Sequence, residues 1–165
     1  KILKNLLIPQ SDESKDKKIY VTREDSSYRK IINEADIVPI LRSKGYKVIN
    51  PQLYNIDEQI KIFSKADKII SPHGSNLSNI IFCKPGTEVY EIGPTFKNEY
   101  EKVFENRYMY LAKINNIRYT RFLADTVPVK KHSDLAKKYI NKKILDNSSY
   151  YKNLIVKVKE INDII

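Results

Sequence analysis

The side chains best suited to chemistry lie in a short polar loop at residues 71–76, Ser-Pro-His-Gly-Ser-Asn. An apolar strand containing Ile69 and Ile70 precedes the loop, and a short helix is expected to begin near Asn76. A helix that begins after a strand leaves free backbone N–H groups and the positive end of its dipole beside the loop. His73 adds a titratable donor at the same place. This arrangement predicts a site for a phosphorylated or otherwise anionic ligand.

Each residue of this loop has a functional and a structural interpretation. His73 could donate to a pyrophosphate oxygen or act as a general base, whereas the structural alternative is a loop histidine satisfied by a backbone carbonyl. Gly74 allows a ligand to approach the backbone closely. Ser75 and Asn76 can cap the short helix and leave its N–H groups aimed at an anion, although capping alone would also explain both residues. We expect a catalytic role for His73 and phosphate binding by residues 74–76.

Two arginines and a glutamate follow other predicted strands. Arg23 and Arg29 carry planar guanidinium groups, which can bind phosphate through paired hydrogen bonds. The alternative is a surface ion pair with one of the carboxylates at residues 24–25. Glu91, directed inward from a strand, could hydrogen-bond the ribose hydroxyls of a nucleoside, whereas Glu88 is expected to face solvent.

The sequence lacks the spacings of the common metal and nucleotide motifs. His132 is far from His73 and no paired acidic motif occurs, so no metal site is predicted. Neither G-x-x-x-x-G-K-[ST] nor G-x-G-x-x-G is present, which excludes the P-loop and the usual dinucleotide fingerprint. The single cysteine, Cys83, excludes an internal disulfide and a cysteine-based zinc cluster, and we expect it to be a buried thiol.

Predicted strands and helices alternate along the chain. We expect strands at residues 18–22, 46–49, 67–71, 87–92 and 118–121, and helices at residues 57–66, at residues 97–115 and after Asn33, which is expected to cap its helix. This alternation predicts an α/β fold with a Rossmann-like parallel sheet and helices on both faces. Ligands of such sheets bind outside the carboxyl ends of the strands, where Arg23, His73 and Glu91 would converge.

The composition indicates one domain with a basic surface. The chain has 165 residues, 41% of them hydrophobic, and no apolar run long enough to span a membrane. The net charge of +10 favours anionic partners, but the late lysines between residues 130 and 143 are expected to form a solvated face, so no nucleic-acid partner is predicted. The chain begins with Lys1 and its only methionine is Met109, so we expect it to be a piece of a longer protein.

Several of these segments, taken in order and spacing, resemble glycosyltransferase family 61, which includes protein O-linked N-acetylglucosamine transferases, plant xylan transferases and bacterial capsule-type relatives. The similarity covers roughly residues 18–95. It rests on Y-V-T-R (20–23), Arg29, N-E (33–34), G-Y-K-V-I-N-P (45–51), E-Q-I-x-I-F-S-x-A (58–66), I-I-S-P-H-G-S-N-L-S-N-I-I-F (69–82) and P-G-T-E-V-Y-E-I (85–92). Residues 96–165 match no motif that we can name.

The resemblance implies one half of a GT-B enzyme, in which the C-terminal of two Rossmann-like domains binds a nucleotide-sugar. It implies an inverting transfer from a nucleoside-diphosphate sugar, with a UDP-sugar favoured, to a polysaccharide or glycan acceptor, without a metal or cofactor. Carried over, Arg23, Arg29 and residues 73–76 would contact the donor phosphates, and Glu91 would lie near the nucleoside. The family more often has Ala or Gly where Ser75 stands and Gly where Asn76 stands, a difference that bears on donor affinity.

The pattern of the chain and the resemblance together predict a division of the chain. Residues 1–17 would be a leading segment or linker, residues 18–127 the nucleotide-sugar-binding domain, and residues 128–165 lysine-rich helices that close it. The partner domain would be an N-terminal half of the same enzyme, which this chain lacks, and that half could hold the general base. The alternative is a non-catalytic nucleotide- or glycan-binding module of the same fold, since a fold alone does not determine an activity.

Overall fold

The computed structural model of the chain describes residues 17–96, 99–129 and 134–165. Its strands are β1 (Lys18–Val21), β2 (Lys47–Ile49), β3 (Lys68–Pro72), β4 (Glu88–Pro94), β5 (Arg118–Val127) and β6 (Asn153–Ile155). The α-helices are α2 (Glu34–Ser43), α3 (Ile56–Lys65), α4 (Glu99–Glu105), α5 (Arg107–Ile114), α6 (Asp134–Tyr139), α7 (Lys142–Asn147) and α8 (Val158–Ile164). Three 3-10 helices complete this part of the chain: η1 (Pro51–Leu53), η2 (Ser75–Phe82) and η3 (Ser149–Tyr151).

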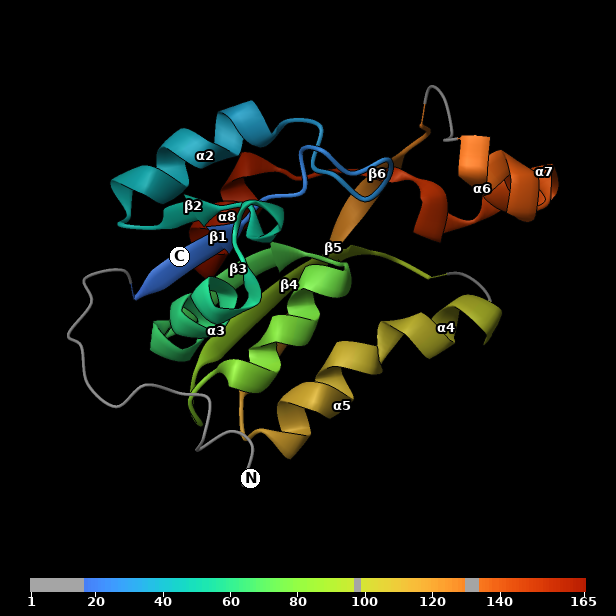
Figure 1. Cartoon of the computed structure of the whole chain (residues 1–165). Coiled ribbons are helices and arrows are strands. Elements are labelled where there is room, and N and C mark those ends of the chain that lie inside the picture. Colours follow the sequence, from blue (N-terminus) through green and yellow to red (C-terminus); the bar gives the residue numbers. More distant parts are fainter. Residues whose placement is uncertain (1–16, 97–98, 130–133) are drawn as a thin grey trace.

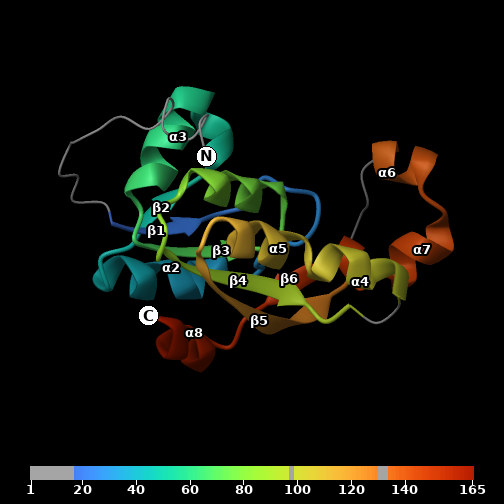
Figure 2. The same cartoon turned by 90° about the horizontal axis from the view of Figure 1, so that it is seen from below.

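The strands form one sheet in the order β2-β1-β3-β4-β5-β6. The first five are parallel and β6 runs antiparallel to β5, so the prediction of a wholly parallel sheet is wrong at this edge. The parallel part has the order 2-1-3-4-5 of one common doubly wound fold, in which the chain reverses its direction of travel between β1 and β3. Figure 2 shows these strands side by side between two groups of helices.

Two hydrophobic cores cover the two faces of the sheet. One face packs against α3, η2 and α5 and buries side chains such as Ile19, Phe63 and Ile80. The other face packs against α2 and α8 and buries Tyr20 and Ile161 among others. Neighbouring residues of β1 thus enter opposite cores, as the two-residue period of a strand requires. Figure 1 shows the helices above and below the sheet, which confirms the α/β class with helices on both faces.

The helix that follows Asn33 begins without the expected side-chain cap. The Asn33 side chain makes no capping hydrogen bond to α2. Its Nδ2 instead donates to the Val156 carbonyl at 2.8 Å, and its Oδ1 accepts from the Val156 N–H at 3.1 Å. Asn33 therefore binds the C-terminal segment to the start of α2, an interaction that local sequence does not reveal. At α3, by contrast, Asn55 and Glu58 form a complete capping box.

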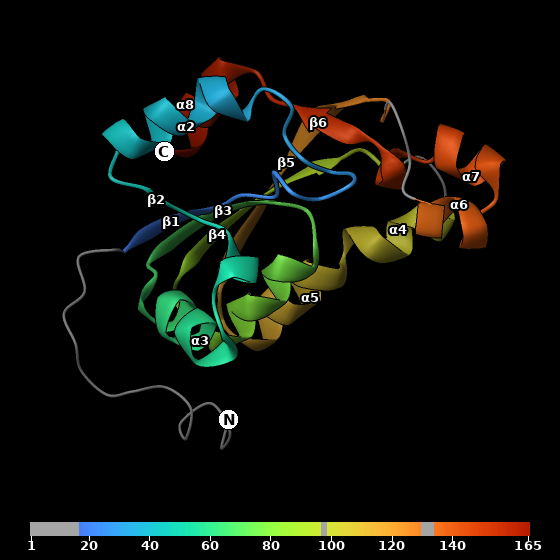
Figure 3. The same ribbon diagram turned by 45° about the horizontal axis from the view of Figure 1, so that its top comes forward.

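The last third of the chain differs most from the expectation of lysine-rich helices alone. β5 continues to Val127, six residues beyond the strand expected at residues 118–121, and β6 adds a strand after α7. Leu154 in β6 donates its N–H to the Lys30 carbonyl at 2.9 Å and accepts from Ile32 at 2.9 Å, so the segment lies against the loop before α2. A three-residue strand with a distant partner gives no clear local pattern. Helices α6 and α7 lie beyond the carboxyl ends of the parallel strands, on the side of α4 and clear of α2 and α8 (Figure 3).

Other local predictions meet mixed outcomes. The helix expected at residues 97–115 is two helices, α4 and α5, separated at Asn106. Cys83 is buried as predicted. Apart from Lys17, the leading segment 1–17 lies outside the described residues, and so do Lys130 and Lys131. Of the helices that the structure describes, none combines the length and the apolar character needed to cross a membrane.

Candidate functional site

The residues predicted to converge do converge at the carboxyl ends of the parallel strands. Arg23 follows β1, His73 follows β3, and Glu91, the middle residue of β4, reaches His73 with its carboxylate. β1 and β3 are the strands between which the sheet order reverses, where ligands of doubly wound folds bind. All three side chains are buried, with 8% of Arg23, 1% of His73 and none of Glu91 exposed.

The guanidinium group of Arg23 packs directly on Gly74. A Cβ atom at residue 74 would lie 2.0 Å from Nη1 and 2.6 Å from Cζ of Arg23, so the close contact requires glycine. The Nε atom of Arg23 is buried without a hydrogen-bond partner. The predicted alternative, an ion pair with Asp25, is absent, because Asp25 accepts from Asn50 at 2.9 Å instead. Burial and the neighbouring charge of Arg29 lower the pKa of Arg23 to about 10.

Arg29 lies beside Arg23 but, unlike Arg23, is hydrogen-bonded to protein groups. Its Nε donates to the His73 carbonyl at 3.1 Å and its Nη1 to the Tyr150 carbonyl at 2.8 Å. Its Cζ lies 3.8 Å from the ring centroid of Tyr150 and 4.9 Å from that of Tyr28. Its backbone has a φ of 59°, an uncommon value for a residue with a side chain. Arg29 therefore holds the residue-73 loop and the C-terminal segment together.

The loop that leads into η2 has a different start from the one predicted. Gly74 is the residue before η2, and no side chain caps the helix, so the prediction that Ser75 and Asn76 act as caps is wrong. The first helical hydrogen bond runs from the Leu77 N–H to the Gly74 carbonyl at 2.9 Å. Ser75 is exposed and Asn76 is half-buried. Phosphate binding by these two residues stays a prediction.

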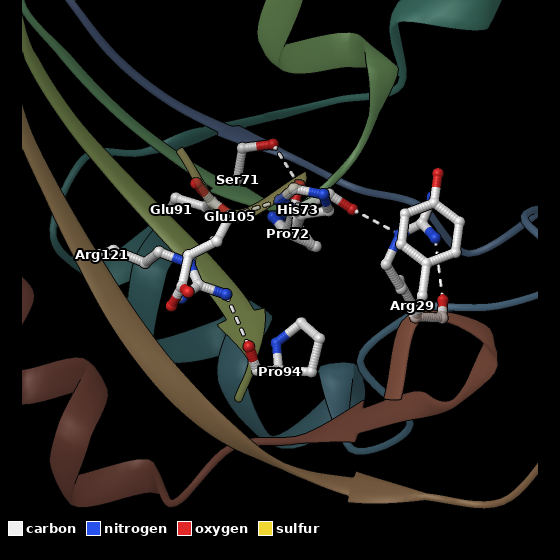
Figure 4. Close-up of polar contacts among 9 residues, drawn as sticks. Arg29, Ser71, Pro72, His73, Glu91, Pro94, Glu105 and Arg121 are labelled. Atoms are coloured by element: carbon white, nitrogen blue, oxygen red, sulfur yellow. Dashed lines mark hydrogen bonds and ion pairs between the residues drawn. The ribbon is translucent and has the colours of Figure 1, made fainter. Parts of the chain in front are cut away.

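His73 and Glu91 form a buried pair. His73 Nδ1 is hydrogen-bonded to Glu91 Oε1, and Arg121 Nε donates to the same oxygen at 3.4 Å. Arg121 also donates to the Glu105 carboxylate and to the Pro94 carbonyl, at 2.5 Å each. Figure 4 shows Arg121 and Arg29 on opposite sides of His73.

The surroundings of His73 disfavour its charged form. Its ring makes edge contacts with Phe96 and Tyr108, at centroid distances of 5.4 and 5.3 Å. Burial lowers the pKa of His73 below its usual value, and the charges of Arg29 and Arg121 lower it further, although the hydrogen bond and charge of Glu91 act in the opposite direction. The net pKa is lowered, so His73 is neutral at pH 7. The alternative of a histidine satisfied by a backbone carbonyl is wrong, because its Nδ1 partner is a carboxylate.

Sequence reasoning missed Arg121 and Tyr150, which complete the cluster. Arg121 belonged to a predicted strand, and its register opposite Glu91 could have indicated the pairing if the strand order had been known. Tyr150 lies in the segment that was expected to be helical, and nothing in its local sequence marks it. Among the described residues, no three His, Cys, Asp or Glu side chains gather closely enough to hold a metal ion.

The arrangement as a whole suits an anion. The guanidinium groups of Arg23 and Arg29 are buried side by side, next to a neutral histidine. Among the described residues, no carboxylate forms an ion pair with either of them. Charged groups buried without a counterion are costly, so a bound anion would relieve the cost. Arg23, with free donors, is the group best placed to bind one.

One known family matches the chain. The model of the family Glycosyltransferase 61 matches residues 1–90 of the 165. A search of curated proteins found no match. The matched part contains Arg23, Arg29 and the loop at residues 71–76, and it ends one residue before Glu91. The roles of Glu91 and Arg121 must therefore be argued from their geometry.

Proposed function

We propose that this chain, which belongs to glycosyltransferase family 61, binds the diphosphate of a nucleotide-sugar donor at Arg23 and the loop of residues 74–76. Family membership makes it a glycosyltransferase. The donor is a nucleoside-diphosphate sugar, with a UDP-sugar favoured, and the acceptor is a polysaccharide or another glycan. Assignment of the donor, the acceptor and the domain role belongs to this proposal.

One observation carries the proposal: Arg23 is buried, charged and unpartnered. It makes no side-chain hydrogen bond among the described residues, and its nearest charged neighbour is another arginine. A phosphate oxygen beside Gly74 would accept from Arg23 and reduce the repulsion between Arg23 and Arg29. Charge-assisted hydrogen bonds of this kind contribute about 1.5–3 kcal/mol each.

The same groups suit the chemistry of transfer. As an acceptor hydroxyl attacks the anomeric carbon, the bond to the diphosphate breaks and negative charge accumulates on the leaving group. A guanidinium group already held in place stabilises that charge without reorganisation. We propose an inverting, metal-independent reaction on this basis, with the phosphate charge neutralised by arginine.

We further propose that the chain is the donor-binding half of a GT-B enzyme. Residues 18–127 would form the Rossmann-like nucleotide-sugar-binding domain, residues 128–165 would close it, and residues 1–17 would lead into it. The order 2-1-3-4-5 of the parallel strands supports a nucleotide-binding sheet. The acceptor-binding site, and any further catalytic groups, would then lie in an N-terminal domain.

The direct test is calorimetric binding of UDP to Arg23→Met. We expect affinity to fall about 10- to 100-fold, as for the loss of one or two charge-assisted hydrogen bonds. The variant without ligand should be more stable than the parent, on the order of 1–3 kcal/mol, because a buried charge beside Arg29 is removed. This combination of greater stability and weaker binding is expected of a binding residue and not of a structural one.

The matched control is Arg118→Met, which removes an arginine of the same sheet that is 70% exposed and paired with Glu88. Its UDP affinity should equal that of the parent. Binding by other nucleoside diphosphates names the base, and EDTA in a second series tests metal independence. Equal UDP affinity in Arg23→Met and the parent would refute the phosphate site.

A further inference from the structure

Glu91 has the contacts of a residue that acts through His73. Its side chain is fully buried, and its second oxygen, Oε2, is also buried. Its first oxygen is shared by His73 and Arg121. A ribose hydroxyl could reach this carboxylate only if the cluster opened, so the geometry does not favour the nucleoside contact that the family resemblance implies.

We propose that Glu91 is a positioning residue that fixes the tautomer and orientation of His73, and that Arg121 holds Glu91 in place. A carboxylate accepts hydrogen bonds and cannot donate them. The hydrogen between Glu91 and a neutral His73 therefore belongs to Nδ1. The other ring nitrogen, Nε2, then carries a lone pair, and it makes no hydrogen bond among the described residues.

Arg121 supports this geometry from the next strand. Residues 91 and 121 are paired in the register of β4 and β5. The Arg121 guanidinium is anchored at Glu105 and at the Pro94 carbonyl, so it has little freedom to leave Glu91. Gly93 provides the space, because a Cβ there would lie 3.1 Å from both Arg121 Nη2 and Glu91 Oε1.

This assignment separates the two roles that the sequence allows for His73. A neutral His73 with hydrogen on Nδ1 accepts at Nε2, which suits a general base and not a donor to a phosphate oxygen. The His73 side chain is 2% exposed, so the acceptor can reach Nε2 only if the groups over the ring move. In the transfer, Nε2 would then take the proton of the acceptor hydroxyl while the hydroxyl oxygen bonds to the anomeric carbon and the diphosphate leaves with the electron pair. This step rests on the proposed function, whereas the tautomer and its control by Glu91 do not.

The charged and titratable groups around His73 come from five elements. They are Glu91 on β4, Arg121 on β5, Arg29 before α2, Tyr108 on α5 and Tyr150 in η3. Of these groups, Glu91 alone raises the pKa of His73, and it does so through both its hydrogen bond and its charge. Arg121 lowers it. Removal of Glu91 should therefore lower the pKa of His73, and removal of Arg121 should raise it.

The test is NMR of the imidazole nitrogens in the ligand-free chain, with His132→Gln as background so that only His73 is observed. The parent should show hydrogen on Nδ1 at neutral pH. In Glu91→Gln the pKa of His73 should fall, because the charge of the carboxylate is lost, and in Arg121→Gln the pKa should rise. In Glu91→Leu, which also removes the acceptor of Nδ1–H, the preference for hydrogen on Nδ1 should be lost. Glu88→Gln and Arg118→Gln, the neighbouring pair of the same two strands, should leave both properties unchanged.

Several outcomes would overturn the assignment. Hydrogen on Nε2 in the parent refutes it even if no variant folds. A pKa of His73 that rises or stays constant in Glu91→Gln also refutes the assignment, provided that the variant is folded. Folding must be verified, because loss of structure alone would raise the pKa toward its ordinary value of about 6.5. The proposed function fails separately: Nδ1–H in the parent without any UDP binding would remove the donor site and leave the roles of Glu91 and Arg121 in place.

Discussion

Strands β4 and β5 carry two glutamate–arginine pairs of the same composition, one at the start of their ladder and one in its middle. Glu88 is in register with Arg118 and Glu91 with Arg121. The first pair lies at the amino ends of the strands, where Glu88 and Arg118 are 2.8 Å apart and their side chains are 32% and 70% exposed. The second lies in the middle of the ladder, where the side chains of Glu91 and Arg121 are 0% and 13% exposed.

The difference shows that the place of such a pair in the sheet, and not its residue types, decides what the pair does. The exposed pair is solvated, and Glu88 also interacts with Lys68 at 3.7 Å. The buried pair is bonded through Glu91 to His73, whose ring contacts Phe96 and Tyr108. Ion pairs at the surface contribute little, whereas the loss of one partner of a buried pair leaves an uncompensated charge.

The largest expected effect is on the buried pair itself. Arg121→Met should lower the free energy of unfolding by about 3–5 kcal/mol, because the Glu91 and Glu105 carboxylates lose their common partner. Arg118→Met should lower it by about 0–1 kcal/mol. Urea denaturation of both variants and the parent gives the two values. Similar losses in the two variants would mean that burial does not distinguish the pairs.

A second contrast concerns glycines near the two ends of the sheet. Gly74→Ala forces Arg23 away, so UDP affinity should fall about tenfold or more, as for the loss of one charge-assisted hydrogen bond. Gly45 precedes β2, has a φ of +81° and has no heavy atom within 4 Å of an added Cβ. Gly45→Ala should therefore cost about 1–2 kcal/mol of stability from backbone strain and leave affinity unchanged. Unchanged affinity in Gly74→Ala would show that Arg23 does not need its present position.

A third prediction uses pH. His73 has a lowered pKa in the fold, so the unfolded chain takes up a proton first as the pH falls below about 6.5. The stability due to neutral His73 is thus present above that pH and is lost on acidification. Thermal unfolding between about pH 8 and about pH 5 should show a smaller decline for His73→Gln than for the parent. His132→Gln serves as the control, and a decline equal to that of the parent in both variants would contradict the lowered pKa.

The smallest effect is expected at Tyr46, which comes just before β2. Its hydroxyl is buried without a hydrogen-bond partner, like Nε of Arg23, but it lies at the end of the sheet away from the site. Burial raises the pKa of Tyr46 above its usual value. Tyr46→Phe should change stability at neutral pH by no more than about 0.5 kcal/mol and leave UDP affinity unchanged. A clear loss of UDP affinity would extend the site to the amino ends of the strands.

Local patterns were sufficient where the side chains of neighbouring residues decide the structure. The apolar residues of β1, β3 and β4 and the turns between the elements predicted five parallel strands and their convergence at Arg23, His73 and Glu91. The same reasoning failed for Asn33, Ser75 and Asn76, whose expected capping bonds do not form. At Asn33 a partner more than 120 residues away, Val156, competes successfully for the side chain.

The sequence by itself determined the α/β class, the family and the polar loop between β3 and η2, because these depend on residue types at short spacing. Only the tertiary structure decided how the cluster is connected. β6 binds the C-terminal segment to the loop before α2, Arg29 joins Tyr150 to His73, and Arg121 reaches Glu91 across the β4–β5 register. Such contacts join residues far apart in the chain, and their free energy comes from burial and charge, which no local spacing encodes.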